Sequence, residues 1–277
     1  LVQILQEIRN LWGLKAGAEI TTEANPDTAD EKYIETLAEG GFTRISFGMQ
    51  SAVPHVLKTL DRTHTPENVT RGVKAANSFG LRSSVDLIYG APGESLDDWR
   101  ESVEMALSLG VNHISAYALT VEPCTKMGRQ IAKGIITSPD DDDEAQKYEL
   151  ADELFNSAGL KWYEISNWAR LGFESQHNLG YWRNIDWAGI GPGAHSHYNA
   201  ANRISKQSMD DSASLTNPNE FYNLRSWDIL HPKRWAHAIN LGNVPWQNYE
   251  CINAEDALIE EVMLGLRIKE GLSLIHI

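Results

Sequence analysis

The first 120 residues alternate between short β-branched runs and amphipathic helical segments, and this alternation limits the folds open to the chain. Strands are expected at 18–23, 43–49, 81–89 and 111–120, with helices at 1–12, 31–40, 65–78 and 95–109. Strands separated by helices of about 10–15 residues pair in parallel through right-handed crossovers. The strands are interpreted as nearly continuous apolar runs covered on both faces, and this pattern predicts an α/β fold with a parallel sheet, either doubly wound or a (β/α) barrel. Four strands are too few to close a barrel, so a partly closed one is expected.

Polar side chains fall near the carboxyl ends of these predicted strands. Glu23 ends the first strand, Gln50 ends the second, Asp86 lies within the third, and Arg62 follows the second in a loop. Parallel α/β folds carry their chemistry at this edge. Carboxylates accept hydrogen bonds from hydroxyls and amines, and arginine binds carboxylates. The four residues therefore predict a site for a small ligand with those groups. Taken singly, each also fits a loop cap or a surface ion pair.

Tryptophan and histidine concentrate in the second half of the chain. Seven of the nine tryptophans lie within 162–246 and five of the nine histidines within 177–237, which places a boundary somewhere in 121–160. On a helix, His177 and Tyr181 would share a face. An imidazole beside aromatic and glycine surfaces suits a planar apolar ligand with a central metal. The alternative is a tryptophan-rich core in which the histidines are hydrogen-bonded packing residues.

Composition excludes several classes of protein. The 24 basic and 38 acidic side chains give a net charge of −14, which argues against a nucleic-acid partner. No run approaches the roughly 18 apolar residues of a membrane-spanning helix. Two cysteines, Cys124 and Cys251, cannot form a disulfide framework, and this usage favours a reducing cytoplasm.

Eight short segments carry a resemblance to a known family. They are TEANPD (22–27), ISFGMQS (45–51), LDRTH (60–64), DLIYGAPGES (86–95), YEISNWA (163–169), HNLGYW (177–182), GIGPGAHS (189–196) and HPKRW (231–235). In this order they resemble the radical S-adenosylmethionine (radical SAM) enzymes related to oxygen-independent coproporphyrinogen III oxidase. The segment HNLGYW is similar to the HNxxYW pattern of the heme-chaperone branch, the HemW type.

The resemblance implies a fold and a set of site residues. The fold is a partial (β/α) TIM-like barrel of the radical SAM type over 1–122, an α+β accessory region over 123–253, and the start of a winged-helix-like region over 254–277. S-adenosylmethionine would contact the same four residues that were singled out above, Glu23, Gln50, Arg62 and Asp86. Heme would bind at His177, Asn178, Tyr181 and Trp182, with His177 as the ligand of the iron.

The chain also departs from the family pattern. Family members carry CxxxCxxC, whose thiolates hold a [4Fe–4S] cluster, followed by a GGGTP-type segment that contacts S-adenosylmethionine. Neither occurs in the 277 residues. Both are expected to lie before Leu1, so the chain is expected to be an internal fragment and catalytically inactive as given. The final residues, 274–277, do not resemble the family's continuation.

The resemblance leaves two function classes. One is a heme chaperone that binds heme and delivers it to an acceptor protein. The other is oxygen-independent coproporphyrinogen III oxidase, which decarboxylates propionates in heme synthesis. We favour the chaperone, because HNLGYW marks that branch and no basic cluster matches four porphyrinogen carboxylates. The available basic residues are scattered: Arg170, Arg183, Arg203, Lys206, Arg225, Lys233 and Arg234. The acceptor is not identified, and a homodimer stays open.

Overall fold

The structure is a computed structural model that describes residues 1–199 and 222–272. Arg203, Lys206 and residues 274–277, which the sequence analysis considered, lie outside the described residues. The chain divides into two compact units, Leu1–Glu174 and Ser175–Ile277. Each unit is described by itself. No helix among the described residues combines the length and the apolar composition needed to cross a bilayer.

The first unit contains the alternating strands and helices that the sequence predicts. Its strands are β1 (Thr21–Ala24), β2 (Arg44–Gln50), β3 (Arg82–Tyr89), β4 (His113–Ala118), β5 (Lys161–Glu164) and β6 (Asn167–Ala169). Its helices are α1 (Val2–Trp12), α2 (Glu31–Glu39), α3 (Pro54–Thr59), α4 (Pro66–Ser78), α5 (Leu96–Ser108), α6 (Lys126–Ala132) and α7 (Asp141–Ser157). Side-chain hydrogen bonds cap the first turn of several of these helices. Asp30, for example, accepts a hydrogen bond from the Tyr33 amide over 2.7 Å at the start of α2.

The six strands form one sheet in the order β1-β2-β3-β4-β6-β5. The first four are parallel, as predicted, and β6 and β5 extend the sheet in antiparallel fashion. The mostly parallel α/β architecture is therefore confirmed. The alternating pattern of the first 120 residues does not indicate that the β5–β6 hairpin joins this sheet. A strand as short as β6 gives almost no periodic signal.

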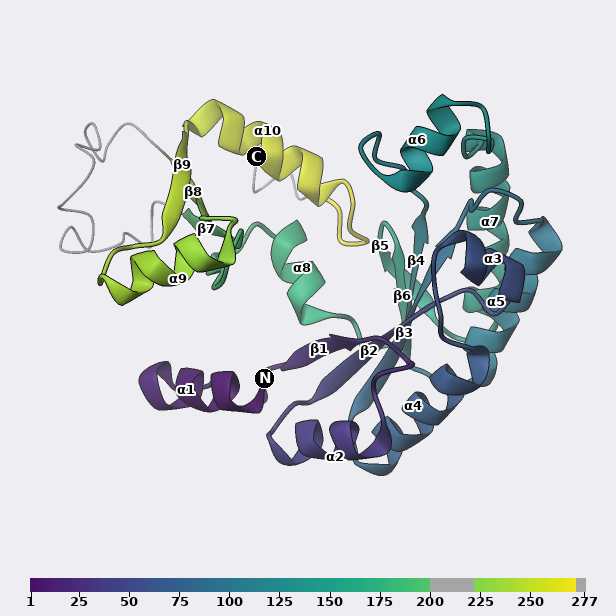
Figure 1. Ribbon diagram of the computed structural model, residues 1–277, viewed down its shortest axis with the longest axis horizontal. Helices are drawn as coiled ribbons and strands as arrows, with labels where there is room; N and C mark the ends of the chain where they lie inside the picture. Colours follow the sequence, from purple (N-terminus) through teal and green to yellow (C-terminus); the bar gives the residue numbers. More distant parts are fainter. Residues whose placement is uncertain (200–221, 273–277) are drawn as a thin grey trace. The chain divides into compact units, whose positions relative to one another are not determined.

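One face of the sheet holds the hydrophobic core. The helices α2, α4, α5 and α7 lie along this face (Figure 1). Its fully buried strand residues include Ile45, Phe47, Val85, Leu87 and Ile114. Because successive strand residues point to opposite sides, the residues between them face away from these helices.

The opposite face of the same sheet is polar. Across β2, β3 and β4 it carries Arg44, Ser46, Gln50, Ser84, Asp86, His113, Ser115 and Tyr117. The sequence analysis treated these strands as nearly continuous apolar runs covered on both sides, and that interpretation was wrong. The strands alternate instead, and most of the polar members are buried nevertheless. A buried polar face needs hydrogen-bond partners, and Ser46, Ser84 and Asp86 find theirs within the face, as described below.

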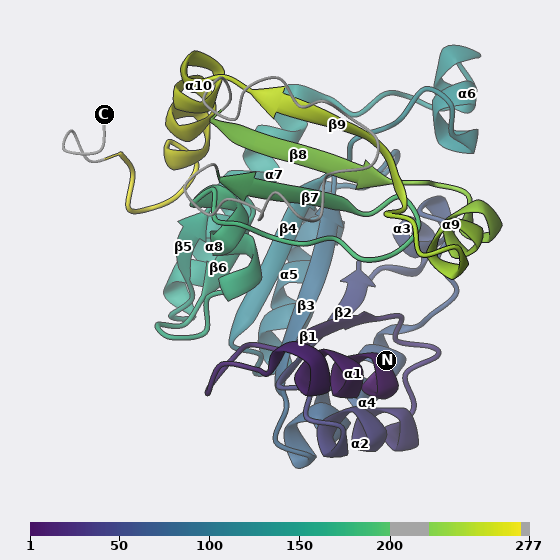
Figure 2. The ribbon, with the colours of Figure 1, turned by 90° about the vertical axis from the view of Figure 1, so that its left-hand side faces the viewer.

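The second unit is built on a small antiparallel sheet. Its strands β7 (His195–Asn199), β8 (Asn223–Asp228) and β9 (Trp246–Ile252) pair in that order. Its helices are α8 (Gln176–Trp182), α9 (Pro232–Asn240) and α10 (Ala254–Gly265). The helices α9 and α10 lie at opposite ends of the three strands (Figure 2). The first compact unit ends at Glu174, whereas the family regions were predicted to divide at 122 and 253. That division of the chain remains a prediction.

Candidate functional site

Glu23 and Asp86 belong to one polar site on the first unit. Strand register pairs Glu23 of β1 with Ser46 of β2, and Ser46 Oγ donates a hydrogen bond to Asp86 Oδ2 over 2.9 Å. The next strand contributes Ser115, which register places beside Asp86 and which also hydrogen-bonds to its carboxyl group. The structure therefore brings together two carboxylates that are 63 positions apart in the sequence.

The electrostatics of Asp86 follow from its place on the sheet. Burial raises the pKa of the Asp86 carboxyl, and the charge of Glu23 acts in the same direction. Hydrogen bonds from Ser115 and Ser46 and the charge of Arg44 oppose this rise in pKa. A carboxylate with a raised pKa beside a second acid is an environment that favours a cationic or hydroxyl-bearing partner.

Gln50 ends β2 in an unusual backbone conformation. Its φ is 61°, a left-handed value that a residue other than glycine seldom adopts. The register with β3 is also irregular between Phe47 and Gln50. The side-chain amide folds back over Gly48, where an added Cβ would lie 2.8 Å from Gln50 Nε2. Strain of this kind at a strand end is common at ligand sites.

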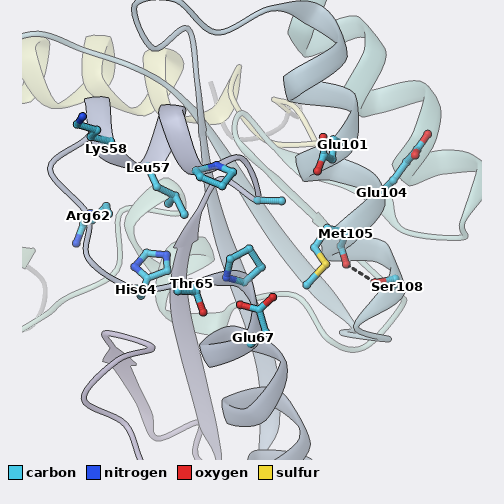
Figure 3. A pocket seen from close by; sticks show the side chains of 13 residues that line it. Leu57, Lys58, Arg62, His64, Thr65, Glu67, Glu101, Glu104, Met105 and Ser108 are labelled. Atoms are coloured by element: carbon cyan, nitrogen blue, oxygen red, sulfur yellow. Dashed lines mark hydrogen bonds between the residues drawn. The ribbon is translucent and has the colours of Figure 1, made fainter.

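Arg62 lies in the loop between α3 and α4 and is exposed. It lines a hollow of about 740 Å³ formed by α3, α4 and α5, together with His64 and Glu67 (Figure 3). This hollow is bordered by helices on the apolar side of the sheet. The structure thus groups Glu23 with Asp86, places Gln50 at the end of β2, and sets Arg62 on a separate loop.

The turn that follows Asp86 is fastened by a buried ion pair. Lys147 of α7 lies 3.2 Å from Glu94 Oε2, and the two side chains are 1% and 0% exposed. Lys147 Nζ also donates to the Glu94 carbonyl over 3.0 Å, and Glu94 Oε2 accepts from the Gly90 amide over 2.8 Å. Burial raises the pKa of the Glu94 carboxyl against the opposing effect of Lys147. The connection between this turn and α7 was not predicted from the sequence.

The second predicted site lies on the short helix α8. Ser175 caps this helix by accepting a hydrogen bond from the Asn178 amide over 3.3 Å. His177 and Tyr181 share one face, as predicted, with ring centroids 4.6 Å apart in a T-shaped arrangement. Both are exposed. Trp182 lies under the Arg267 guanidinium, 5.7 Å from the ring centroid.

Aromatic contacts continue from α8 towards β7. The rings of Tyr181 and Trp187 meet at 4.8 Å, and Trp187 stacks on His197 at 4.7 Å. Burial lowers the pKa of His197. Gly189 packs directly on the backbone of His195, where a Cβ would collide. The backbone that approaches Gly189 is therefore the start of β7.

Several residues of the polar face were absent from the sequence analysis. They are Arg44, Ser46, Ser84 and Ser115. A signal for them exists, because in ISFGMQ the even positions 46, 48 and 50 are small or polar while 45, 47 and 49 are apolar. This period of two was overlooked among the β-branched and aromatic residues. Lys147 has no comparable signal, because a lysine on a helix is ordinarily a solvent-exposed side chain.

Asp86→Asn is expected to increase stability at neutral pH, by on the order of 1 kcal/mol, because functional carboxylates are often held at a cost to the fold. The raised pKa means that folded Asp86 binds a proton more readily than unfolded Asp86. The wild-type chain therefore gains stability as pH falls through the folded pKa, down to the unfolded value of 3.8, and the difference from Asn shrinks. Urea unfolding at several pH values measures this. Exposed Glu101→Gln serves as the control, and a destabilised Asp86→Asn would contradict the assignment.

Comparison with known proteins places this architecture in a family. Residues 1–106 match the model of the radical SAM superfamily. These residues of the chain form a radical SAM domain. The solved structure of coproporphyrinogen III oxidase (HemN) from Escherichia coli, described as a radical SAM enzyme, superimposes with a TM-score of 0.75 at 16% identity. The match covers 96% of this chain and 59% of that one, and it supports the radical SAM fold.

Curated relatives extend the similarity through the second unit. The heme chaperone HemW of Mycobacterium tuberculosis is 38% identical over 275 residues, which are 99% of this chain and 65% of that protein. HemW of Bacillus subtilis is 32% identical over 257 residues, which are 92% of this chain and 62% of that protein. The chain thus spans slightly less than two thirds of these relatives. The chain is similar in sequence to these heme chaperones along almost all of its own length.

Proposed function

We propose that this chain is part of a heme chaperone of the radical SAM superfamily, which binds heme and passes it to an acceptor protein. The relatives named heme chaperone share about a third or more of their aligned residues with it, and the alignment includes α8. The proposal names no particular acceptor protein. A cytoplasmic location is proposed from the two cysteines, both of which are free and exposed.

The geometry of α8 carries this proposal. An exposed imidazole suits the axial position of a heme iron, and His177 is exposed beside Tyr181. The neighbouring rings of Tyr181 and Trp187 give an apolar surface for a flat macrocycle. Asn178 and Trp182 complete the segment, with the Asn178 amide held by the helix cap. This arrangement supports His177 as the ligand of the iron.

S-adenosylmethionine fits the polar face of the first unit. Its amine and its ribose hydroxyls are donors, and Glu23, Gln50 and Asp86 supply acceptor oxygens. Arg62 lies apart from this face, and its assignment to the ligand's carboxylate rests on the family resemblance alone. A [4Fe–4S] cluster does not fit the residues present, because it needs more thiolates than Cys124 and Cys251 provide. No group of metal-binding side chains occurs in the described ranges either.

The oxidase alternative requires basic residues gathered around a porphyrinogen with four carboxylates. In the second unit, Arg183 is paired with Glu270 at 2.7 Å and Arg225 with Glu260 at 2.6 Å. Two of the basic side chains named in the sequence analysis are therefore already engaged within the fold. The similarity to HemN is at 16% identity and concerns the fold alone. These observations favour the chaperone.

A heme titration tests the proposal. We expect the 277-residue chain to bind heme with the absorption band of an imidazole-coordinated iron. His177→Leu is expected to lose that band and to bind at least about tenfold more weakly, because the axial bond is removed. The titration is followed by Soret absorbance and by the quenching of tryptophan fluorescence.

His237→Leu is the matched control, because His237 is an exposed histidine on a helix of the same unit. Its affinity should equal that of the unaltered chain. Equal heme spectra for His177→Leu and the unaltered chain would remove His177 from the site. Turnover of coproporphyrinogen III by the whole protein would instead favour the oxidase.

A further inference from the structure

A chain of hydrogen bonds crosses the polar face of the first unit and ends on Asp86. Arg44 Nη2 donates to Ser84 Oγ over 3.3 Å. Ser84 Oγ donates to Ser46 Oγ over 2.8 Å, and Ser46 Oγ donates to Asp86 Oδ2 over 2.9 Å. Strands β2 and β3 lie side by side in parallel, and their register pairs Ser46 with Ser84.

Arg44 at one end of this hydrogen-bond chain and Asp86 at the other determine which group donates in each of its hydrogen bonds. A guanidinium can only donate, so Ser84 accepts from Arg44 and has its own hydrogen left to give. An ionised carboxylate can only accept, so Ser46 must point its hydrogen at Asp86. All the donors therefore point from the cation towards the anion. Hydrogen bonds aligned in one sense polarise and strengthen one another.

The two ends of the hydrogen-bond chain differ in how deeply they are buried. Arg44 is 4% exposed and Ser84 is 0% exposed, whereas Asp86 is half-buried and Glu23, beyond it, is exposed. The Arg44 end of the hydrogen-bond chain is therefore buried, and the Asp86 carboxylate faces the accessible side of the sheet. With Ser46 and Ser115 holding it, Asp86 keeps oxygen lone pairs for a ligand, because a carboxylate accepts about four hydrogen bonds.

We propose that Ser46 is a positioning residue, which together with Ser84 and Arg44 holds the Asp86 carboxylate in place as an acceptor for the hydroxyl or amine groups of S-adenosylmethionine. The choice of ligand rests on the proposed function. The hydrogen-bond chain itself does not depend on that choice.

Titration of Asp86 by carbon-13 NMR of its carboxyl group tests the positioning role without any ligand. Ser46→Ala removes a donor to the charged form, so the pKa of Asp86 should rise by about one unit. The charged groups that influence Asp86 are Glu23 on β1 and Arg44 on β2. On β4, burial keeps His113 and Tyr117 uncharged over the same pH range, because it lowers the pKa of His113 and raises that of Tyr117.

Two further variants separate positioning from a general loss of stability. Ser46→Thr keeps the hydroxyl and should keep the Asp86 titration of the unaltered chain. Ser83→Ala removes another buried hydroxyl from β3, one that faces the opposite side and donates to Asn77 Oδ1 over 3.0 Å. This control should leave the titration unchanged. An unchanged pKa of Asp86 in Ser46→Ala, or an equal shift in Ser83→Ala, would overturn the proposal.

Calorimetric binding of S-adenosylmethionine to the 277-residue chain then tests the ligand. Affinity should fall about tenfold in Ser46→Ala and stay unchanged in Ser83→Ala. Equal affinity of Ser46→Ala and the unaltered chain would overturn the role in binding. If the unaltered chain binds no S-adenosylmethionine while Asp86 still shifts, the proposed cofactor fails and the positioning of Asp86 stands.

Discussion

Lys147→Met is expected to lower the free energy of unfolding by about 3–5 kcal/mol, because it strands a buried carboxylate without its cation. Lys147 and Glu94 are almost fully buried and lie 3.2 Å apart. The same substitution also removes a hydrogen bond to the Glu94 carbonyl and the contact with Asp143 at 2.6 Å. Urea unfolding followed by circular dichroism measures the loss. The loss should be smaller at acid pH, where a protonated Glu94 no longer needs a cation.

Two further variants test whether burial of the ion pair causes the stability loss in Lys147→Met. Lys126→Met breaks an ion pair with Asp61 whose side chains are 68% and 71% exposed, and it should cost less than about 1 kcal/mol. The double variant Lys147→Met, Glu94→Gln removes the stranded charge and should recover much of the stability. Equal losses from Lys147→Met and Lys126→Met would show that the buried pair does not hold the turn after β3.

Trp168→Ala is expected to cost about 3–5 kcal/mol, because it removes a large side chain from a closed core and leaves a cavity. Trp168 lies on β6 and is 0% exposed. Its ring packs against Tyr148 and Phe155 of α7 at 5.3 and 5.2 Å, and its indole nitrogen donates to Asp152 Oδ1 over 2.8 Å. Thermal and urea unfolding both report the change.

The unfolding of Trp168→Ala also tests where the first structural unit of the chain ends. Since β6 pairs with β4, removing Trp168 should lower the cooperative unfolding of the whole first unit. Trp12→Ala, at a side chain that is 70% exposed, should change stability by less than about 0.5 kcal/mol. Separate melting of 123–174, with the parallel strands unaffected, would instead favour a boundary near residue 122.

The two candidate sites were found in the sequence by different kinds of signal. Glu23, Gln50 and Asp86 were found because strands that alternate with helices present their carboxyl ends at one edge. His177 and Tyr181 were found because a spacing of four places two side chains on one helical face, and α8 is helical. Both arguments use local periodicity, which a single sequence carries. The roles of these residues in binding remain predictions.

The polar face was accessible to the same argument but was missed. Ser46 and Ser84 alternate with large apolar residues, and the apolar members dominated the interpretation of their strands as buried on both sides. Small hydroxyl side chains contribute little to a hydropathy pattern. Their hydrogen bonds need a register between neighbouring strands, and β2 contains an irregularity just before Gln50.

By itself, the sequence determined the order of strands and helices, the parallel pairing and the face of α8 that carries His177. These features depend on periodicity and capping within short segments, as in the Asp30 cap of α2. Only the tertiary structure decided that Lys147 fastens the turn after Asp86, that β5 and β6 extend the sheet, and that Arg44 connects through two serines to Asp86. Lys147 lies 53 positions from Glu94. Contacts across such separations depend on how complete elements pack, and no local pattern of residues encodes that packing.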